Sequence, residues 1–512
     1  MLVSILWMFL ISKAMSSITE EKLTCLYPSP SSIQPCFCHM QAEFEAEDVK
    51  CSEDVKCDDD YDNAWAEKRT FSGTFYKTVT CSFEDTSSFS KAAQAFYYDN
   101  LIPVLKISGR KHEGDFFLKK EDLGRLNVSS LAIEIAHLND QKIFEDGAFK
   151  GSEDSIYFLS VKIKNSHKVQ YNAGHVGLGY IKQICSSLET LSAHGVSYIQ
   201  PEDFQGCSKL SYLRLMNSNM AVIGPDSFRH LPNLQNFDFS SHSKFWIKTG
   251  AFKNLKKLEN VHFYAASNLG EEYPILSPEH YNFNKTVISS GAFKSLPSLR
   301  VLGFSCTDMY RCKENPMGVD LFEEMPFLGL DQLQEFVVLK GQQTSLPRLF
   351  DNASKLWKFL FKPGLKTINE NAFEGLSNVT EIFLADNKLT FLNRAFSGLP
   401  HLTKIDLSNN GIVSFNNSLQ ELPSLKKVDI SGNTGFTSLN TVKDDLGSHM
   451  DDNDHGDHNI FQIIMNDIPL DCGCDMKWLA RDQAMLRYFA PEAKCVDGVL
   501  LKTVSKASKN SL

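Results

Sequence analysis

Residues 379–387 read VTEIFLADN, residues 402–410 read LTKIDLSNN and residues 425–433 read LKKVDISGN. The blocks start 23 residues apart, with apolar residues at positions 1, 4 and 6 and asparagine at position 9. Positions 4 and 6 point to one face of a strand, and positions 3, 5 and 7 point to the other. A fixed period of this length predicts a solenoid whose stacked coils bury the apolar face, while each asparagine bonds backbone groups at a turn.

A recurring phenylalanine is predicted to fill the far side of each coil. It occurs as Phe149, Phe204, Phe228, Phe252, Phe293, Phe350, Phe373 and Phe396. Weaker copies of the strand block start at Leu210, Leu234, Leu258, Leu299, Leu333 and Leu356. The spacing exceeds one period between Phe252 and Phe293 and again between Phe293 and Phe350, so we expect an insertion around residues 269–284 and a second irregular stretch.

These repeats resemble the leucine-rich-repeat family. The resemblance implies an α/β fold, namely a curved solenoid with a parallel β-sheet on its concave face and cysteine-rich caps at both ends. We therefore predict a signal peptide (1–16), an N-terminal cap (17–100) and the solenoid (101–440). An acidic loop rich in histidine and aspartate (441–460) and a C-terminal cap (461–512) follow.

The N-terminus indicates export. Residues 2–11 form an apolar run of signal-peptide length, and small residues follow it. No later stretch reaches 18 apolar residues, so we expect no membrane anchor in this chain. Beside a signal peptide, the five N-x-S/T sequons become candidate glycosylation sites: Asn127, Asn284, Asn352, Asn378 and Asn416.

The 13 cysteines fall in sequence clusters, which suits disulfides in an oxidising compartment. They are Cys25, Cys36, Cys38 and Cys51; Cys57 and Cys81; Cys185 and Cys207; Cys306 and Cys312; Cys472, Cys474 and Cys495. The last cluster, with Trp478, resembles the C-terminal cap of the family, which usually has four cysteines, so this cap is either variant or truncated. The resemblance implies that Cys472 or Cys474 pairs with Cys495.

The first cluster resembles the N-terminal cap of the family, which implies that its four cysteines pair among themselves. The phrase around Pro28, Pro35, Cys36 and Cys38 is similar to secreted arthropod leucine-rich-repeat proteins like the non-catalytic subunit of oplophorus-luciferin 2-monooxygenase. This resemblance implies a protein that accompanies or stabilises an enzyme without performing the oxidation.

Charge and motifs limit the chemistry. The net charge of −10 disfavours nucleic acid or anionic membrane as the main partner. We find no HExxH, GxSxG, CxxC or phosphate-loop motif, and we expect no catalytic residue, cofactor or metal. Residues 444–458, rich in aspartate and histidine, have the chemistry to bind a divalent cation, although a solvated acidic loop is the simpler interpretation.

The strand positions predict a binding face for an extracellular protein. Val337, Leu360 and Phe383 occupy position 5 of successive blocks and should form an exposed apolar stripe, so that Leu360→Asp should be tolerated by the fold. The residues predicted to lie beside or border the stripe are Leu339, Trp357, Asp406 and Asp429. The alternative is that a long loop covers the stripe. None of the sequons falls on the predicted outward strand positions, so glycans would leave this face open.

Three functions remain open from the sequence. The first is a secreted binding protein that acts as a partner, carrier or non-catalytic subunit. The second is the ectodomain of a Toll-like or Slit-like receptor, which a longer transcript with an apolar 20-residue segment would establish. The third is an enzyme with an unrecognised site, which turnover of a substrate by the purified protein would reveal.

Overall fold

The structure is a computed structural model. It describes residues 36–42, 75–83, 102–109, 118–120, 123, 128–135, 144–163, 177–218, 220–241, 244–265, 285–294, 296–306, 319–339, 341–439, 442, 461–472, 479 and 483–503. The predicted signal peptide, the acidic residues 444–458, Asn127 and Asn284 lie outside these residues. So do Cys25, Cys51, Cys57, Cys312 and Cys474, and of Cys36, Cys38, Cys81 and Cys306 only the backbone is described.

The chain divides into two compact units, residues 1–215 and 216–512. The strands of unit 1 are β1 (Cys36–Ala42), β2 (Phe75–Phe83), β3 (Ile102–Gly109), β4 (Val128–Ile135), β5 (Phe158–Ile163) and β6 (Thr190–His194), and β7 (Tyr212–Ser218) contains the boundary. β1 is antiparallel to β2, and β2 to β6 run parallel in chain order. Because β2 pairs with β3, the parallel sheet extends into the segment predicted as the N-terminal cap.

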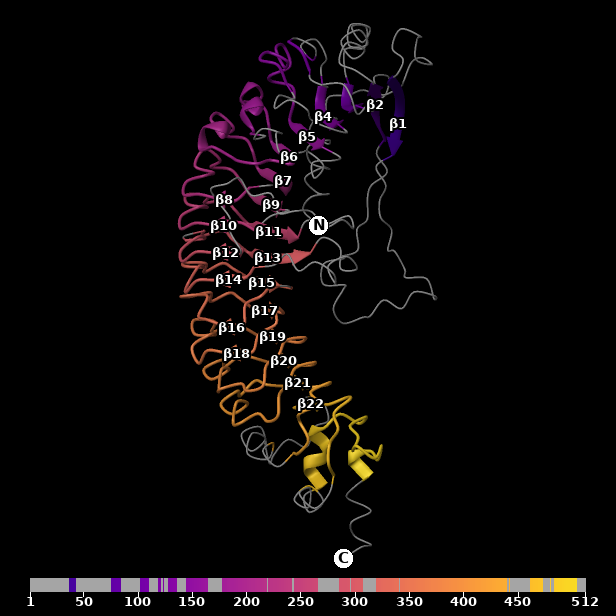
Figure 1. Cartoon of the computed structure of the whole chain (residues 1–512), viewed down its shortest axis with the longest axis vertical. Helices are drawn as coiled ribbons and strands as arrows, with labels where there is room; N and C mark the ends of the chain where they lie inside the picture. Colours follow the sequence, from indigo (N-terminus) through magenta and orange to yellow (C-terminus); the bar gives the residue numbers. More distant parts are fainter. Residues whose placement is uncertain are drawn as a thin grey trace, which may run out of the picture. The chain divides into compact units, whose positions relative to one another are not determined.

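The main sheet of unit 2 is a parallel ladder with one strand per coil. Its strands are β9 (Asn236–Ser241), β11 (Asn260–Ala265), β13 (Val301–Cys306), β15 (Glu335–Val338), β17 (Lys358–Phe361), β19 (Glu381–Phe383), β20 (Lys404–Asp406), β21 (Lys427–Asp429) and β22 (Gln462–Ile464). Equivalent block positions pair directly, for example Ile382 with Ile405 and Ile405 with Val428. Within unit 2 this ladder lies on the inner side of the arc that the coils form (Figure 1).

The first coils of unit 2 also form a second, smaller parallel sheet, separate from the main sheet. It consists of the two-residue strands β8 (Val222–Ile223), β10 (Trp246–Ile247), β12 (Val287–Ile288) and β14 (Leu321–Phe322). A further pair is formed by β16 (Ser345–Leu346) and β18 (Thr367–Ile368). Elsewhere the described return segments are turns and the 3-10 helices η4 (Gly179–Gln183), η5 (Pro201–Phe204) and η8 (Gln483–Tyr488).

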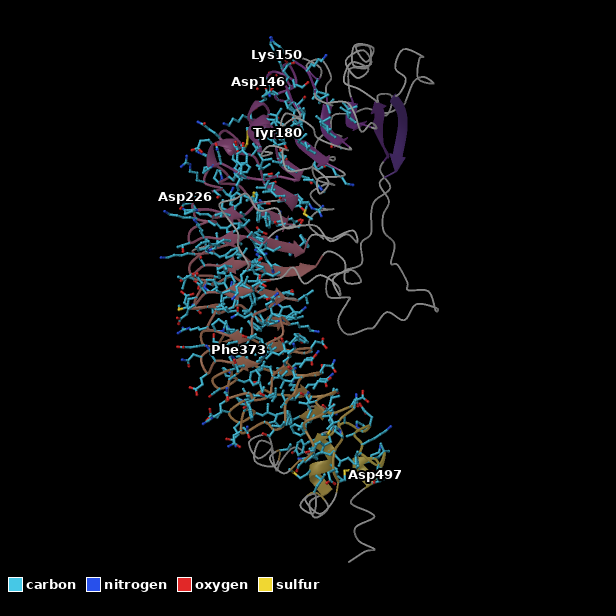
Figure 2. All side chains as sticks on the ribbon, in the orientation of Figure 1. Asp146, Lys150, Tyr180, Asp226, Phe373 and Asp497 are labelled. Carbon is cyan, nitrogen blue, oxygen red and sulfur yellow. A yellow bond between two sulfur atoms is a disulfide. The ribbon has the colours of Figure 1, made fainter. Side chains whose placement is uncertain are left out.

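The recurring phenylalanines fill the interior of the coils, as predicted. Phe252 and Phe293 stack with ring centroids 4.7 Å apart, and Phe373 and Phe396 are 5.6 Å apart. Figure 2 labels Phe373 among the side chains of unit 2. The sequence analysis missed Phe327, which is fully buried between Phe293 and Phe350 with centroid distances of 5.5 and 5.2 Å. Burying such a side chain is worth roughly 1.5–3 kcal/mol, so this column is a main source of stability.

The asparagines at block position 9 bond the backbone of neighbouring coils. The side-chain amide of Asn387 donates to the carbonyls of Phe361 and Leu384 at 2.8 and 2.9 Å. Its Oδ1 accepts from the backbone N–H groups of Gly364 and Leu365 at 2.9 and 2.8 Å. One buried amide thus satisfies four backbone groups where the chain leaves the strand, which confirms the role predicted from its position.

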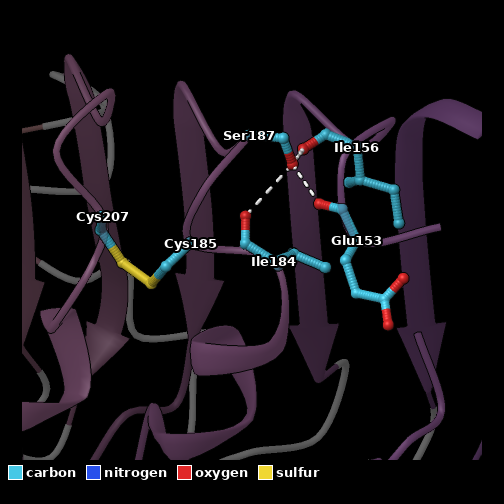
Figure 3. The surroundings of a disulfide bond; sticks show 6 residues. All are labelled: Glu153, Ile156, Ile184, Cys185, Ser187 and Cys207. Atoms are coloured by element: carbon cyan, nitrogen blue, oxygen red, sulfur yellow. Dashed lines mark hydrogen bonds between the residues drawn. A yellow bond between two sulfur atoms is a disulfide. The ribbon is translucent and has the colours of Figure 1, made fainter. Parts of the chain in front are cut away.

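Two disulfides join cysteines of the predicted clusters. Cys185 pairs with Cys207, and Cys472 pairs with Cys495, as the resemblance to the C-terminal cap implied. Beside the first, the hydroxyl of Ser187 lies 2.6, 2.8 and 3.2 Å from the carbonyl oxygens of Glu153, Ile156 and Ile184 (Figure 3). The disulfide and this hydroxyl cross-link consecutive coils of unit 1 where the repeat sequence is most degenerate.

Candidate protein-binding face

The register predicted for the main-sheet face of unit 2 is confirmed. Val337 pairs with Leu360, and Leu360 pairs with Phe383. The next two rungs place Asp406 beside Phe383 and Asp429 beside Asp406. Their neighbours Phe359, Phe361 and Ile382 are buried in the core, so the position-5 side chains lie on the opposite surface of the sheet.

The predicted exposure of the apolar stripe was wrong. Val337 is 0%, Leu360 7% and Phe383 6% exposed, and the three side chains form one buried cluster against which Leu339 packs. Rungs lie about 4.8 Å apart, so large neighbouring side chains on one face contact each other. The Lys404 ammonium also lies 4.7 Å from the ring centroid of Phe383. The stripe is therefore a small second core on this face.

An accessible apolar residue beside this face is Trp357, which immediately precedes β17. It is 39% exposed, and the Lys358 ammonium lies 5.7 Å from its ring centroid. Lys358 also approaches Glu335 on the neighbouring rung, with 3.9 Å between the charged atoms. A cation held beside an exposed indole ring presents both polar and apolar contacts, a combination enriched at binding hot spots.

Two carboxylates border the cluster, as predicted. Asp406 is 3% exposed and accepts hydrogen bonds from the Ser408 N–H and hydroxyl at 2.9 and 2.7 Å. Burial raises the pKa of Asp406, the bonds from Ser408 oppose that shift, and the charge of Asp429 adds to it. The Asp429 carboxylate accepts the Ser431 N–H at 2.9 Å. This edge of the face is therefore acidic and partly desolvated.

Asp386 adds a fixed negative charge at the same end of the strands. It accepts hydrogen bonds from Lys362 and from Asn409, both at 2.9 Å. Burial acts to raise the pKa of Asp386, but these two hydrogen bonds outweigh that effect and lower it. The carboxylate stays ionised in mildly acidic solution and sits at a defined position for a partner's cation or N–H group.

Three of the sequon asparagines lie in described residues, and all three are exposed: Asn352, Asn378 and Asn416. Each lies outside the strands of the main sheet. Glycosylation of these residues stays a prediction, and the positions would leave the strands around Trp357 uncovered.

Another polar group, which the sequence analysis missed, lies on the main sheet of unit 2. His262 Nδ1 lies 3.3 Å from Asp238 Oδ1, and the hydroxyl of Tyr264 donates to the same oxygen at 3.4 Å. Asp238 and His262 are directly paired, and Gly303 on the next rung leaves His262 room, since a Cβ there would lie 3.2 Å from its ring. Their shared strand position was the available signal. Among the described residues, no group of three or more histidines, cysteines and carboxylates could hold a metal ion.

Two family models match the repeats. "Leucine rich repeat" matches residues 363–412 and 393–434, and "BspA type Leucine rich repeat region (6 copies)" matches residues 181–300. The solenoid is built of leucine-rich repeats. The clean blocks quoted first lie inside the former match, and the phenylalanine-rich coils around β9 to β12 lie inside the latter.

Solved structures show the same fold at low sequence identity. TLR13, in its complex with ssRNA13, is 16% identical with a TM-score of 0.54, covering 81% of this chain and 58% of TLR13. A leucine-rich-repeat protein of Leptospira interrogans is 14% identical with a TM-score of 0.46, covering 79% of this chain and 87% of that protein. Toll of Drosophila, in its complex with Spätzle, is 13% identical with a TM-score of 0.43, covering 81% and 68%.

The likeness to TLR13 shows the fold alone, and the chain spans less than two thirds of TLR13. A comparison with curated protein sequences gave no significant match. Within the described residues, none of the helices combines the length and apolarity that a membrane crossing requires.

Proposed function

We propose that this chain is an extracellular leucine-rich-repeat protein that binds a protein partner on the main-sheet face of β15 to β21. The observation that carries the proposal is the exposed Trp357, which lies beside Lys358 and immediately precedes β17, the strand that contributes Leu360 to the buried cluster. An exposed tryptophan next to an ordered strand loses little conformational entropy on binding, which suits a hot spot.

The charges of the face define the partner. On one side of the cluster, Glu335, Lys358, Glu381 and Lys404 alternate in charge along successive rungs. Asp406 and Asp429 continue the row of the cluster itself. A partner segment with an apolar centre and charges of both signs at its rim would complement this arrangement. Because Asp406 and Asp429 lie only at the β20 and β21 end of the cluster, we expect the positive end of such a segment to lie there.

Extracellular localisation is part of the proposal. The signal-like N-terminus, the five sequons and the disulfides Cys185–Cys207 and Cys472–Cys495 support it. Repeat scaffolds of this kind are typically binding surfaces, and the proposal gives the chain no catalytic role. A role as the non-catalytic companion of an enzyme rests on the N-terminal cap phrase and stays a proposal.

The test compares two exposed aromatic residues. The tagged protein is secreted from animal cells, its partner is captured from the extracellular fluid of the source tissue and identified, and affinities are then measured with purified components. Trp357→Ala should weaken binding by about 2 kcal/mol, roughly thirtyfold, whereas Phe391→Ala, at a 51% exposed residue outside the strands, should not. Equal affinities for wild type and Trp357→Ala would exclude this face.

A receptor ectodomain is the second candidate for the same fold. The fold that the chain shares with TLR13 is compatible with it, although that likeness does not extend to the ligand. Isolation of the full-length transcript decides between the two. A continuation that encodes an apolar segment of about 20 residues would make the chain a receptor ectodomain.

A further inference from the structure

A second apolar surface lies on the small sheet of unit 2, away from the face described above. The first residues of β8, β10, β12 and β14 pair across four rungs: Val222 with Trp246, Trp246 with Val287, and Val287 with Leu321. We call these four residues the outer row. In Figure 1 the four strands form their own ladder beside β9 to β15.

The outer row points away from the core. The second residues of the same strands are buried, with Ile223, Ile247 and Ile288 at 0% exposure and Phe322 also buried. Side chains alternate along a strand, so the first residues lie on the outward surface. Leu321 is 38% exposed, and the other three are partly exposed. Four apolar residues in register on an outward surface differ from singly scattered ones and indicate a contact site.

Two contacts fix the position of the Trp246 side chain in the outer row. The indole Nε1–H of Trp246 donates to the Ser289 hydroxyl at 2.6 Å. The Lys248 ammonium lies 5.1 Å from the indole ring centroid. The ring is therefore presented in one orientation, which lowers the entropy lost when a partner covers it.

Lysines surround the outer row. Lys248 lies beside Trp246, and Lys285 is exposed two residues before Val287. Lys244 forms an ion pair with the buried Asp320 at 2.7 Å, so its charge is already balanced. Glu323 directly follows Leu321's strand and accepts the Ser290 N–H at 2.9 Å, and Glu324 beside it is exposed. The flanks of the central rungs, at Lys248 and Lys285, are thus positively charged.

We propose that the outer row docks an amphipathic helix of a partner protein whose apolar stripe is flanked by acidic residues. Three rung spacings of about 4.8 Å make the row about 14 Å long. Apolar residues at i, i+3, i+7 and i+10 of an α-helix span about 15 Å, so each apolar side chain meets one rung. An extended segment repeats on one face about every 6.7 Å and matches the rungs poorly.

The charge argues against a second copy of this chain as the occupant. A symmetric pair would bring Lys248 and Lys285 of both copies to one interface, and like charges there are destabilising. Glutamate or aspartate beside the apolar stripe of a helix would instead pair with these lysines. The site is separate from the Trp357 face, so either proposal can fail without the other.

The test uses synthetic helical peptides and the secreted full-length protein. The first peptide is alanine-based, about 15 residues long, with leucines at i, i+3, i+7 and i+10 and glutamates beside them. A second peptide has the same composition with its leucines at alternate positions, and a third has lysine in place of glutamate. Fluorescence anisotropy gives the Kd of each peptide.

The first peptide should bind at least about tenfold more tightly than either of the others. Leu321→Glu should weaken its binding about tenfold or more, whereas Phe391→Glu, an exposed site outside the row, should leave the Kd unchanged. Circular dichroism and thermal melting of both variants confirm that each is folded.

Three results would overturn the proposal. One is the absence of binding by the helical peptide at concentrations up to about 1 mM. Another is equal affinity for the helical peptide and the alternating peptide. The third is concentration-dependent dimerisation in sedimentation equilibrium that Leu321→Glu abolishes, because the outer row would then be an interface between copies of this chain.

Discussion

At the scale of single residues, burial changes the expectation for Leu360. Its strand position suggested an outward side chain that tolerates aspartate, yet it is 7% exposed within the Val337 and Phe383 cluster. Leu360→Asp should lower the free energy of unfolding by about 2–3 kcal/mol, because it puts a charge among apolar side chains. Leu384→Asp, at a fully buried core position, should cost more. Urea denaturation checks both variants, and a Leu360→Asp protein as stable as wild type would show that water reaches the cluster.

Asn387 predicts a second residue-scale effect. Replacing it by alanine leaves the carbonyls of Phe361 and Leu384 and the N–H groups of Gly364 and Leu365 without this partner. Each buried polar group left unsatisfied costs about 1–3 kcal/mol, so Asn387→Ala should lower the free energy of unfolding by several kcal/mol. Asn371→Ala, at an exposed asparagine in a turn of the same coil, is the control. Comparable losses in the two variants would contradict the bonding role of position 9.

Asp406 predicts a pH dependence of stability. Burial, chiefly, raises the pKa of this carboxyl in the folded protein above its ordinary value. The folded state therefore holds its proton longer than the unfolded state, and this group lowers stability as pH rises from the unfolded pKa through the folded one. Asp406→Asn removes this pH-dependent loss of stability and keeps a side-chain oxygen that can accept the hydrogen bonds from Ser408. The stability of Asp406→Asn relative to wild type should rise across this window in denaturation measured at several pH values, and a pH-independent difference would refute the assignment.

At the scale of elements, the disulfides give a direct chemical prediction. Peptide mapping without reduction should recover Cys185 linked to Cys207 and Cys472 linked to Cys495. The former closes a loop of 22 residues, so the double variant Cys185→Ser, Cys207→Ser should be about 3 kcal/mol less stable. Free thiols at these four positions would contradict the described coils. The same peptide map tests the pairing predicted among Cys25, Cys36, Cys38 and Cys51. It also tests a pairing of Cys36 with Cys81, because the backbone register of β1 and β2 places these two residues opposite each other.

The elements that the sequence predicted correctly are the strands whose apolar residues recur at a fixed spacing along the chain. Apolar positions 4 and 6 and the asparagine at position 9 set the register of β19, β20 and β21 directly. The small sheet was not predicted, because strands of two residues such as β10 are too short to show alternation, and the apolar pair that recurs before the coil phenylalanines was not recognised as a strand. Phe327 was missed because it follows Met325-Pro326 and lacks the preceding small residue that marked most other coils. The burial of Val337 was also beyond the sequence, because block spacing shows which side chains are neighbours but not what fraction of each side chain stays exposed.

At the scale of the whole molecule, the chain presents two chemically different surfaces within unit 2. The main-sheet face offers Trp357, charges of both signs and a buried apolar cluster. The outer row offers Trp246 between lysines. Both follow from one principle, that a coil buries one side of each strand and leaves the other side free to vary. Sequence predicted the first surface from position 5 but misjudged which of its residues reach solvent.

Hydroxyl-radical footprinting of the purified protein, with and without its captured partner, tests the central claim most directly. Tryptophan side chains react readily when exposed, so Trp357 and Trp246 report on the main-sheet face and on the outer row in one experiment. Our account predicts that the partner protects Trp357 strongly and leaves the exposed Phe391 unchanged. Unchanged oxidation of Trp357 in a saturated complex would contradict it and place the partner elsewhere on the solenoid.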